Sequence, residues 1–205
     1  MFSRNCSFWK LMGCGKNGSF DKIPDLRQWA VLQVFDASAT SDTASYATPA
    51  FLLHWWQFFH CELSTVVMEP LEGHGKWDGK ECFGNIRRQA DDEGPVGVLT
   101  RATIRIPKLK SFWSNVPGVT AAMNEAEGLI CTVGIGEIPW IKQATFSIWE
   151  NREAMKNFAY RMKAHAAVIR KTREDNWYSE EMFVRFKILS INGFRQHQTG
   201  LEINW

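Results

Sequence analysis

A histidine on the apolar side of a long predicted helix has the clearest potential chemistry in this chain. His165 lies three residues after Met162 and four before Ile169, in a segment predicted to be helical from about residue 151 to Glu174. Residues three and four apart share one face of a helix, so His165 belongs to the stripe that faces the interior. A neutral imidazole on a rigid helix suits an axial ligand of haem iron. The alternative is a core histidine hydrogen-bonded to a backbone carbonyl.

The other histidines and the glycine motifs indicate less. His74 lies in the segment GHGKWDG, where it either faces a bound group or is a plain turn residue. His54 and His60 do not have the i, i+4 spacing of a helical zinc pair. Gly134–Glu137 reads GIGE and lacks the third glycine of a dinucleotide fingerprint. The sequence also has no Walker motif, GxSxG elbow or HExxH motif, which leaves hydrolases and phosphoryl-transfer enzymes without support.

The charge balance argues against a nucleic-acid-binding protein. The 205 residues include 24 basic and 22 acidic side chains, for a net charge of +2, whereas nucleic-acid binding favours a clustered basic face. The densest basic run, from Arg161 to Arg173, is typical of the solvated face of a helix. The other interpretation is that one or two of its cations meet anionic groups such as haem propionates. The ten Trp and fourteen Phe suit a large apolar pocket and ordinary core packing alike.

The five cysteines and the N-terminal sequence point to a reduced, cytoplasmic protein. The number of cysteines is odd and no CxxC pair occurs, which supports neither a disulfide framework nor a zinc ribbon. The first twenty residues lack the apolar run of a signal peptide, and no stretch is long and apolar enough to span a bilayer. We expect a cytoplasmic protein whose contact with a membrane, if it has one, is at the surface.

The first third of the chain is predicted to hold an irregular arm, a strand, a helix and a short strand. Residues 1–27, rich in glycine, form the arm, and residues 28–205 form a single α+β domain. The segment WAVLQVFD (29–36) predicts a central strand. Residues 50–63 predict a helix that is apolar nearly all round, begun by Thr48-Pro49. Such a helix is buried, lies at an oligomer interface, or meets a lipid surface or a long apolar substrate.

The sequence from Pro95 onward predicts the order β-α-β-β-α-β, which is the ferredoxin-like arrangement. The predicted elements are a strand at 96–106, a helix at 108–126 with a break near Pro117, strands at 129–136 and 144–149, the long helix, and a strand at 183–191. We therefore predict an α+β fold of the ferredoxin-like, dimeric α+β-barrel type with an additional N-terminal β-α-β portion. Pairing with a second copy, as a homodimer or larger homo-oligomer, would cover the sheet. Arg101 and Arg105 lie on one face of the first of these strands, which a solvent-facing side of the sheet would explain.

Several segments together resemble the spheroidene monooxygenase family of carotenoid-modifying enzymes. These segments cover most of residues 72–186 in the family's order: GHGKWDG (73–79), VLTRATIRIPKLKSFW (98–113), GIGEIPWIKQATFSIW (134–149), MKNFAY (155–160), His165, IRKTRE (169–174) and NWYSEEMFVRF (176–186). Residues 1–27 and 195–205 carry no recognisable match.

The resemblance implies a haem-dependent monooxygenase of α+β, ferredoxin-like build. Such an enzyme would use O₂, haem b and an electron donor such as a ferredoxin to oxidise a carbon of a long apolar polyene. Repeated hydroxylation at one carbon, followed by loss of water, would leave a ketone. His165 is carried over as the iron ligand because it is the histidine of the matching helix.

The resemblance also suggests further site residues by their place in the matched motifs. Arg101 and Arg105 are candidates for contacts to a propionate or to the distal pocket, and Trp140 and Gln143 for lining the pocket; Arg101, Gln143 and Trp140 form the predicted catalytic set. Met162, Ile169 and His74 join His165 and Arg105 as predicted cofactor contacts.

Two other functions stay open at this point. One is a haem-binding protein of the same fold with a peroxidase-like, haem-handling or sensing role. The other is a cofactor-free domain that binds an apolar ligand or forms a dimer. A carotenoid substrate is an analogy, because one fold and pocket serve different molecules in different proteins.

Overall fold

The structure, a computed structural model, describes residues 6–35, 48–84, 86, 94–164 and 176–193. Its elements in chain order are β1 (Cys6–Gly15), η1 (Lys16–Gly18), β2 (Pro24–Phe35), α1 (Ala50–Phe58), β3 (Thr65–Gly75), β4 (Val96–Ile104), η4 (Ile106–Lys108), α2 (Leu109–Asn124), β5 (Leu129–Ile138), β6 (Lys142–Trp149), α3 (Arg152–Ala164) and β7 (Tyr178–Asn192). The strands form one seven-stranded sheet in the order β2-β1-β5-β6-β4-β7-β3, and the paired neighbours are antiparallel. The fold is therefore α+β with an antiparallel sheet.

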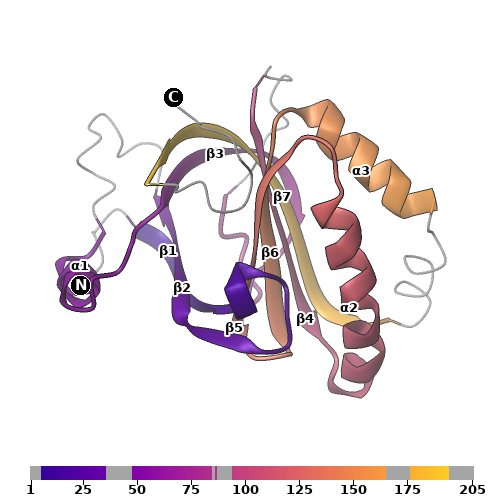
Figure 1. Ribbon diagram of the computed structural model, residues 1–205, viewed down its shortest axis with the longest axis horizontal. Coiled ribbons are helices and arrows are strands. Elements are labelled where there is room, and N and C mark those ends of the chain that lie inside the picture. Colours follow the sequence, from indigo (N-terminus) through magenta and orange to yellow (C-terminus); the bar gives the residue numbers. More distant parts are fainter. Residues whose placement is uncertain (1–5, 36–47, 85, 87–93, 165–175, 194–205) are drawn as a thin grey trace.

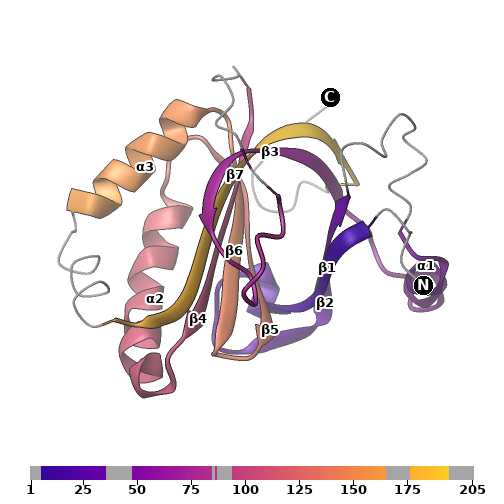
Figure 2. The same cartoon turned by 180° about the vertical axis from the view of Figure 1, so that it is seen from behind.

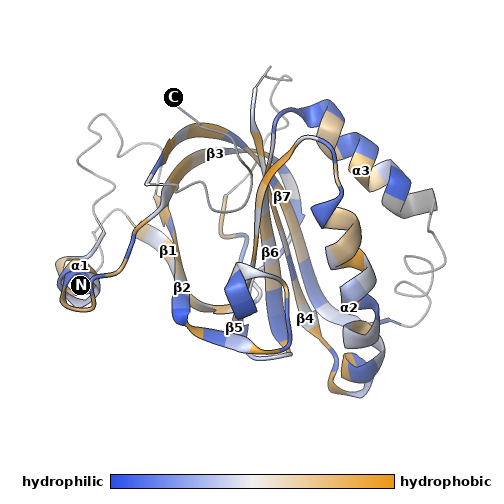
Figure 3. Cartoon of the chain, in the orientation of Figure 1, coloured by the Kyte–Doolittle hydropathy of each residue, from blue (hydrophilic) through white to orange (hydrophobic). Residues whose placement is uncertain are grey.

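Helices α2 and α3 cover one face of the sheet (Figure 1). Val96, Val98 and Trp149 on that face pack beneath α3, where Met155 and Phe158 supply apolar contacts. A second group, centred on Ile104, Phe112, Trp113, Val116 and Trp177, joins α2 to the sheet. The apolar side chains of these helices recur at helical spacing on the side that packs against the sheet, and the rest of α3 is mostly hydrophilic (Figure 3).

The other face of the sheet curls around a separate apolar core. Figures 1 and 2 show the β1–β2 hairpin and the arching β3 on this side, away from α2 and α3. The core of this concave face holds Phe8, Met12, Trp77, Leu99, Ile135, Val184 and Phe186, with Leu32 and Phe146 packed against it. The sheet thus separates two apolar layers, one under the helices and one inside the curl.

The N-terminal segment differs from the prediction, because residues 6–15 of the expected irregular arm form strand β1. Phe8, Met12 and Cys14 point into the curl, while Trp9 and Leu11 between them are exposed. This alternation is the pattern of a half-buried strand. The glycines at positions 13, 15 and 18 obscured it in the sequence, because they also suit an irregular segment.

Several element boundaries differ as well. Helix α2 continues through Pro117 without the predicted break. Helix α1 ends at Phe58 rather than near residue 63, and His60 just beyond it has a φ of +52°, which does not continue a helix. Strand β7 begins at Tyr178, before the apolar run that predicted it. Helix α3 is described from Arg152 to Ala164, and the last part of the long predicted helix lies outside the described residues.

Strand β4 carries buried side chains on both faces, which corrects the interpretation that its arginine-bearing side faces solvent. Val96, Val98 and Ile104 face the helices, as their alternation predicted, whereas Leu99 and Arg101 face the curl and are also buried. Arg105 follows the end of the strand and is exposed. Among the described helices, none is long and apolar enough to cross a membrane.

Candidate functional site

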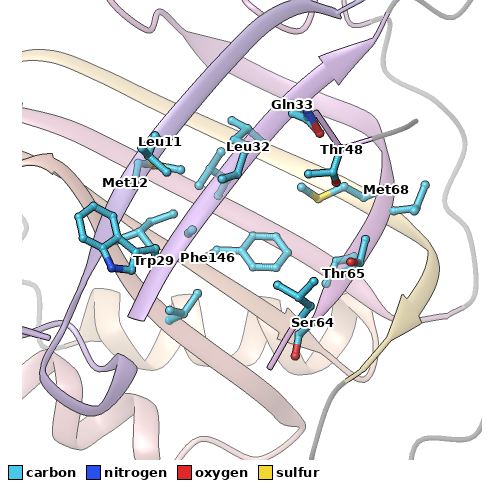
Figure 4. A pocket seen from close by; sticks show the side chains of 18 of the residues that line it. Leu11, Met12, Trp29, Leu32, Gln33, Thr48, Ser64, Thr65, Met68 and Phe146 are labelled. Carbon is cyan, nitrogen blue, oxygen red and sulfur yellow. The ribbon is translucent and has the colours of Figure 1, made fainter. Parts of the chain in front are cut away.

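An apolar cavity of about 2530 Å³ is the most prominent feature of the concave side. Its walls come from the sheet, from β2 and β3 at the two edges of that sheet, and from α1. Figure 4 shows Met12, Leu32 and Phe146 among the side chains that line it, with the polar Gln33 and Thr65 toward one end. Typical small-molecule sites have volumes of about 300–1,000 Å³, so this space suits a large apolar ligand.

Helix α1 contributes an aromatic wall to the cavity, and several of its aromatic side chains are also exposed. Leu52 and Trp56 line the cavity and are buried or half-buried. Phe51, Trp55 and Phe58 are more than half exposed. The helix was predicted to be apolar nearly all round, and the structure shows that only part of this surface is covered by the described residues.

A network of six charged side chains lies beside the cavity core. The members come from five strands and one turn: Lys10 (β1), Asp78 (after β3), Arg101 (β4), Glu137 (β5), Lys142 (β6) and Glu180 (β7). Arg101 is its centre and is only 1% exposed. Its guanidinium donates hydrogen bonds to Glu180 and, at 3.2 Å, to Oδ1 of Asp78, and its Nη2 lies 3.7 Å from Oε2 of Glu137.

Two lysines complete the network. Nζ of Lys10 lies 2.5 Å from Oδ2 of Asp78 and 2.5 Å from Oε1 of Glu137. Nζ of Lys142 lies 2.6 Å from Oδ1 of Asp78. Three cations therefore face three carboxylates, which satisfies the requirement that a buried charge be paired. The network ties β1 and the turn after β3 to the central strands.

The surroundings of Asp78 and Glu180 shift the pKa values of these two carboxylates. Partial burial alone would raise the pKa of Asp78, but the hydrogen bonds and positive charges of Lys10 and Lys142 outweigh it and lower that pKa to about 2. For Glu180, burial again opposes the shift, and the backbone N–H groups of Gly79 and Asp78 lower the pKa below its usual value. Both carboxylates are thus ionised at neutral pH and hold Arg101 in place.

Trp77 connects this network to the apolar core. Its side chain is fully buried, and its Nε1 donates a hydrogen bond of 2.8 Å to Oε2 of Glu137. The guanidinium of Arg101 and the ammonium of Lys10 lie 5.5 and 5.9 Å from the indole ring, within cation–π range. Phe8 packs edge-on against the same ring. The indole is therefore held from several sides and forms a rigid part of the cavity wall.

The structure separates the predicted catalytic residues. Arg101 faces the curl, within the network. Gln143 pairs in register with Ala102 and Gly136, on the opposite side of the sheet from Arg101, and its Nε2 donates to the carbonyl of Ile138. Trp140 lies in the turn between β5 and β6, about half exposed, and its Nε1 donates to the carbonyl of Lys22. These three side chains do not converge on one point.

The predicted cofactor contacts are likewise scattered. Arg105 donates to the carbonyl of Tyr178 at an exposed position. His74 lies near the end of β3, exposed, with its ring stacked on Phe183 and beside a small cavity of about 230 Å³. Met162 lies within α3, while His165 and Ile169 lie outside the described residues.

The haem site stays a prediction, because its proposed iron ligand, His165, lies outside the described residues. Haem would need the large apolar space together with an axial ligand on its wall. The helix that precedes His165, described to Ala164, packs on the face of the sheet opposite the cavity. The thiols of Cys14 and Cys131, which line the cavity, have pKa values raised to about 11 by burial and are protonated at neutral pH.

Sequence reasoning missed most of the charge network. Lys10, Asp78, Glu137 and Glu180 come from distant segments, and each alone resembles an ordinary surface charge. The available signal was their position: Lys10 alternates with Phe8 and Met12 on the inward face of β1, and Glu180 alternates with Met182 on β7. A charge at an inward strand position needs a partner, which only the folded sheet reveals.

Solved structures give only weak likenesses. A candidate monooxygenase from Fusobacterium nucleatum subsp. nucleatum superposes with a TM-score of 0.45 at 9% identity, over 93% of this chain and 79% of its own. SnoaB, a cofactor-independent oxygenase from Streptomyces nogalater, superposes with a TM-score of 0.35 at 16% identity, over 53% of this chain and 99% of its own. Both scores lie below 0.5, so neither likeness assigns an activity. No protein-family model matches the chain.

Curated sequences give a strong match. The spheroidene monooxygenase of Rhodobacter capsulatus is 35% identical over 188 residues, which are 91% of this chain and 77% of that protein. Those of Rubrivivax gelatinosus and Cereibacter sphaeroides are 34% and 33% identical over 91% of this chain, covering 70% and 57% of their own lengths. The chain thus spans a little over half the length of the Cereibacter relative. This identity over nearly the whole chain places it in the spheroidene monooxygenase family.

Proposed function

We propose that this protein is a monooxygenase that oxidises a long, apolar, carotenoid-like substrate held in the cavity of the concave face. The observation that carries the proposal is the cavity itself. It has about 2530 Å³ of space and mostly apolar walls, in a chain whose curated relatives are named for the oxidation of a carotenoid.

The reaction implied is the insertion of one oxygen atom of O₂ into a C–H bond. The second oxygen atom leaves as water, and an external reductant supplies two electrons while two protons are taken up. The role of the described residues in this scheme is to bind and orient the substrate. Met12, Leu32 and Phe146 would contact its apolar length, and Trp77, fixed by Glu137, would keep that part of the wall rigid. Apolar walls also exclude water from the reacting carbon.

The cofactor, the reductant and the assembly are further parts of the proposal. We propose haem b as the group that activates O₂, with His165 as its ligand, on the strength of the family resemblance of the helix that contains it. A ferredoxin-type protein would supply the electrons. The strand order β5-β6-β4-β7, with α2 and α3 on one face, supports the ferredoxin-like assignment. A homodimer would cover the remaining surface of the sheet. We also propose that the protein is located in the cytoplasm.

One experiment addresses the reaction and the cofactor together. The full chain is produced with haem supplied, as wild type and as His165→Ala, and its absorption spectrum is recorded. Each preparation then receives spheroidene, ¹⁸O₂, a ferredoxin, its reductase and NADPH. We expect a Soret band and one ¹⁸O atom per hydroxylation in the wild type, with the band altered and the product lost in His165→Ala.

The other outcomes separate the parts of the proposal. A Soret band in both proteins would move the ligand to another residue. Tight spheroidene binding with no labelled product under any condition would overturn the monooxygenase assignment and favour an apolar-ligand-binding protein. Labelled product without haem would keep the oxygenase and remove the cofactor.

A further inference from the structure

The outer side of helix α1 is an unusually apolar exposed surface. Phe51, Trp55, Phe58 and Phe59 are 54%, 62%, 75% and 56% exposed. The spacing of Phe51, Trp55 and Phe58 (i, i+4, i+7) places them on one side of the helix. Phe59, the residue that follows the helix, packs against Trp55 and Phe58. Soluble monomers rarely expose contiguous aromatic surface of this kind without a binding partner.

The composition of α1 fits the interface of a lipid bilayer. Its nine residues, AFLLHWWQF, contain no carboxylate, lysine or arginine, and His54 is its one ionisable side chain. Trp and Phe are the side chains that favour the boundary between headgroups and acyl chains. A helix of this length is too short to span a bilayer, but it can lie in the plane of the interface.

The inner side of α1 extends the same surface into the cavity. Leu52, Leu53 and Trp56 line the cavity. The exposed Phe51, Trp55 and Phe59 line it as well, so the exposed aromatic surface of α1 is continuous with the cavity wall. Trp29 on β2, itself 58% exposed, lines the cavity as well (Figure 4). A lipid phase in contact with α1 would therefore meet the cavity wall directly.

We propose that α1 is a membrane-docking helix that inserts Phe51, Trp55, Phe58 and Phe59 into the interface of a lipid bilayer and places the cavity against that bilayer. A long apolar substrate has almost no concentration in water and is stored in the lipid phase, so it enters the cavity along α1 without crossing the solvent. This route into the cavity rests on the proposed function, whereas the docking itself does not require turnover.

The absence of charged side chains on α1 makes the proposal specific. Attachment driven by burial of apolar area does not depend on anionic headgroups, unlike the binding of polybasic helices. We therefore expect the protein to bind neutral phosphatidylcholine vesicles, and raised salt to leave that binding intact.

The test is flotation of the purified full chain with phosphatidylcholine vesicles. The variant is Trp55→Ser combined with Phe58→Ser, both on the exposed side of α1. The matched control is Ile106→Ser combined with Tyr160→Ser, which removes two side chains of similar exposure (72% and 65%) on the helix-covered side of the sheet. We expect the α1 variant to lose vesicle affinity by about tenfold or more, and the control to keep it. Brominated lipid should quench tryptophan emission of the wild type more than that of the α1 variant.

Three results would overturn the proposal. The wild-type protein could fail to float with the vesicles, or the α1 variant could float as well as the wild type. The third is that the wild type is a dimer without vesicle affinity and the α1 variant is a monomer. The last of these would assign the surface to a second copy of the chain. Circular dichroism on both variants checks that each is folded. Vesicle binding without turnover would leave the docking intact and remove the oxygenase proposal, so the two failures are distinguishable.

Discussion

At the residue scale, Arg101 is the side chain whose role the structure changes most. Its place in the matched motif suggested contact with a propionate or with the distal pocket, yet its guanidinium is occupied by Glu180, Asp78 and Glu137. A buried guanidinium in such a cage is held by its own partners and has little freedom to bind another anion. The contacts therefore favour a structural role in which Arg101 fixes β4 to β7 and to the turn after β3.

This role predicts a large loss of stability when Arg101 is replaced. Arg101→Met leaves Glu180 and Asp78 without their buried partner, and removal of one member of a buried ion pair costs about 3–5 kcal/mol. Arg101→Lys keeps the charge but loses the forked geometry, so its cost should be intermediate. Urea unfolding followed by circular dichroism measures both variants.

The neighbouring Arg105 supplies the control. It is exposed and makes one hydrogen bond to a carbonyl, so Arg105→Met should change the free energy of unfolding by about 0.5 kcal/mol or less. If Arg101→Met were as stable as the wild type and yet inactive, a catalytic role would replace the structural one.

At the element scale, Gly134 on β5 explains part of the GIGE motif. A Cβ at this position would lie 2.4 Å from Cα of Phe20 and 2.5 Å from the carbonyl oxygen of Ser19. The chain that joins β1 to β2 thus crosses directly over β5, and only a glycine permits that approach. The motif is a packing feature of the sheet and not a nucleotide-binding loop.

Replacement of Gly134 should therefore destabilise the β1–β2 hairpin. Gly134→Ala forces backbone away from backbone, and overpacking of this kind costs about 1–3 kcal/mol. Gly118→Ala, inside α2 with no atom within 4 Å of the new methyl group, should instead stabilise by about 0.5–1 kcal/mol. Urea denaturation compares the two variants, and equal effects at both positions would contradict the close crossing.

The elements from Pro95 onward were predictable because each has a clear periodicity of apolar residues or ends at a residue that breaks helices or strands. Alternation in β4 and the spacing of apolar residues in α2 and α3 place them correctly. Strand β1 was not predictable in this way, since two glycines dilute its alternation, and neither was the early start of β7, whose Glu180 is inward-facing but polar. The charge network could not be read from the sequence because its pairs join distant segments, such as Lys10 on β1 with Glu137 on β5 and Arg101 on β4 with Glu180 on β7.

At the scale of the whole molecule, the cavity depends on the curl of the sheet. Strands β2 and β3 lie at opposite edges of the strand order, yet both line the same cavity. No single segment therefore encodes this site. Its walls combine the concave face, the two edge strands and α1, and the charge network holds β1 and the turn after β3 against the central strands. The function proposed for the cavity can be tested with a larger side chain that occupies part of the cavity and leaves the charge network unchanged.

Leu32→Trp makes that test. Leu32 lies on β2 and points toward the concave core, where Met12 and Phe146 line the same space (Figure 4). A larger side chain there occupies room that a long apolar ligand would need, so affinity for all-trans-retinol, a fluorescent polyene, should fall by about tenfold or more. Asn157→Trp on the exposed side of α3 adds an indole far from the cavity and should leave the affinity unchanged. Fluorescence titration measures both, and unchanged retinol binding in a folded Leu32→Trp protein would show that the polyene does not occupy the space beside Leu32.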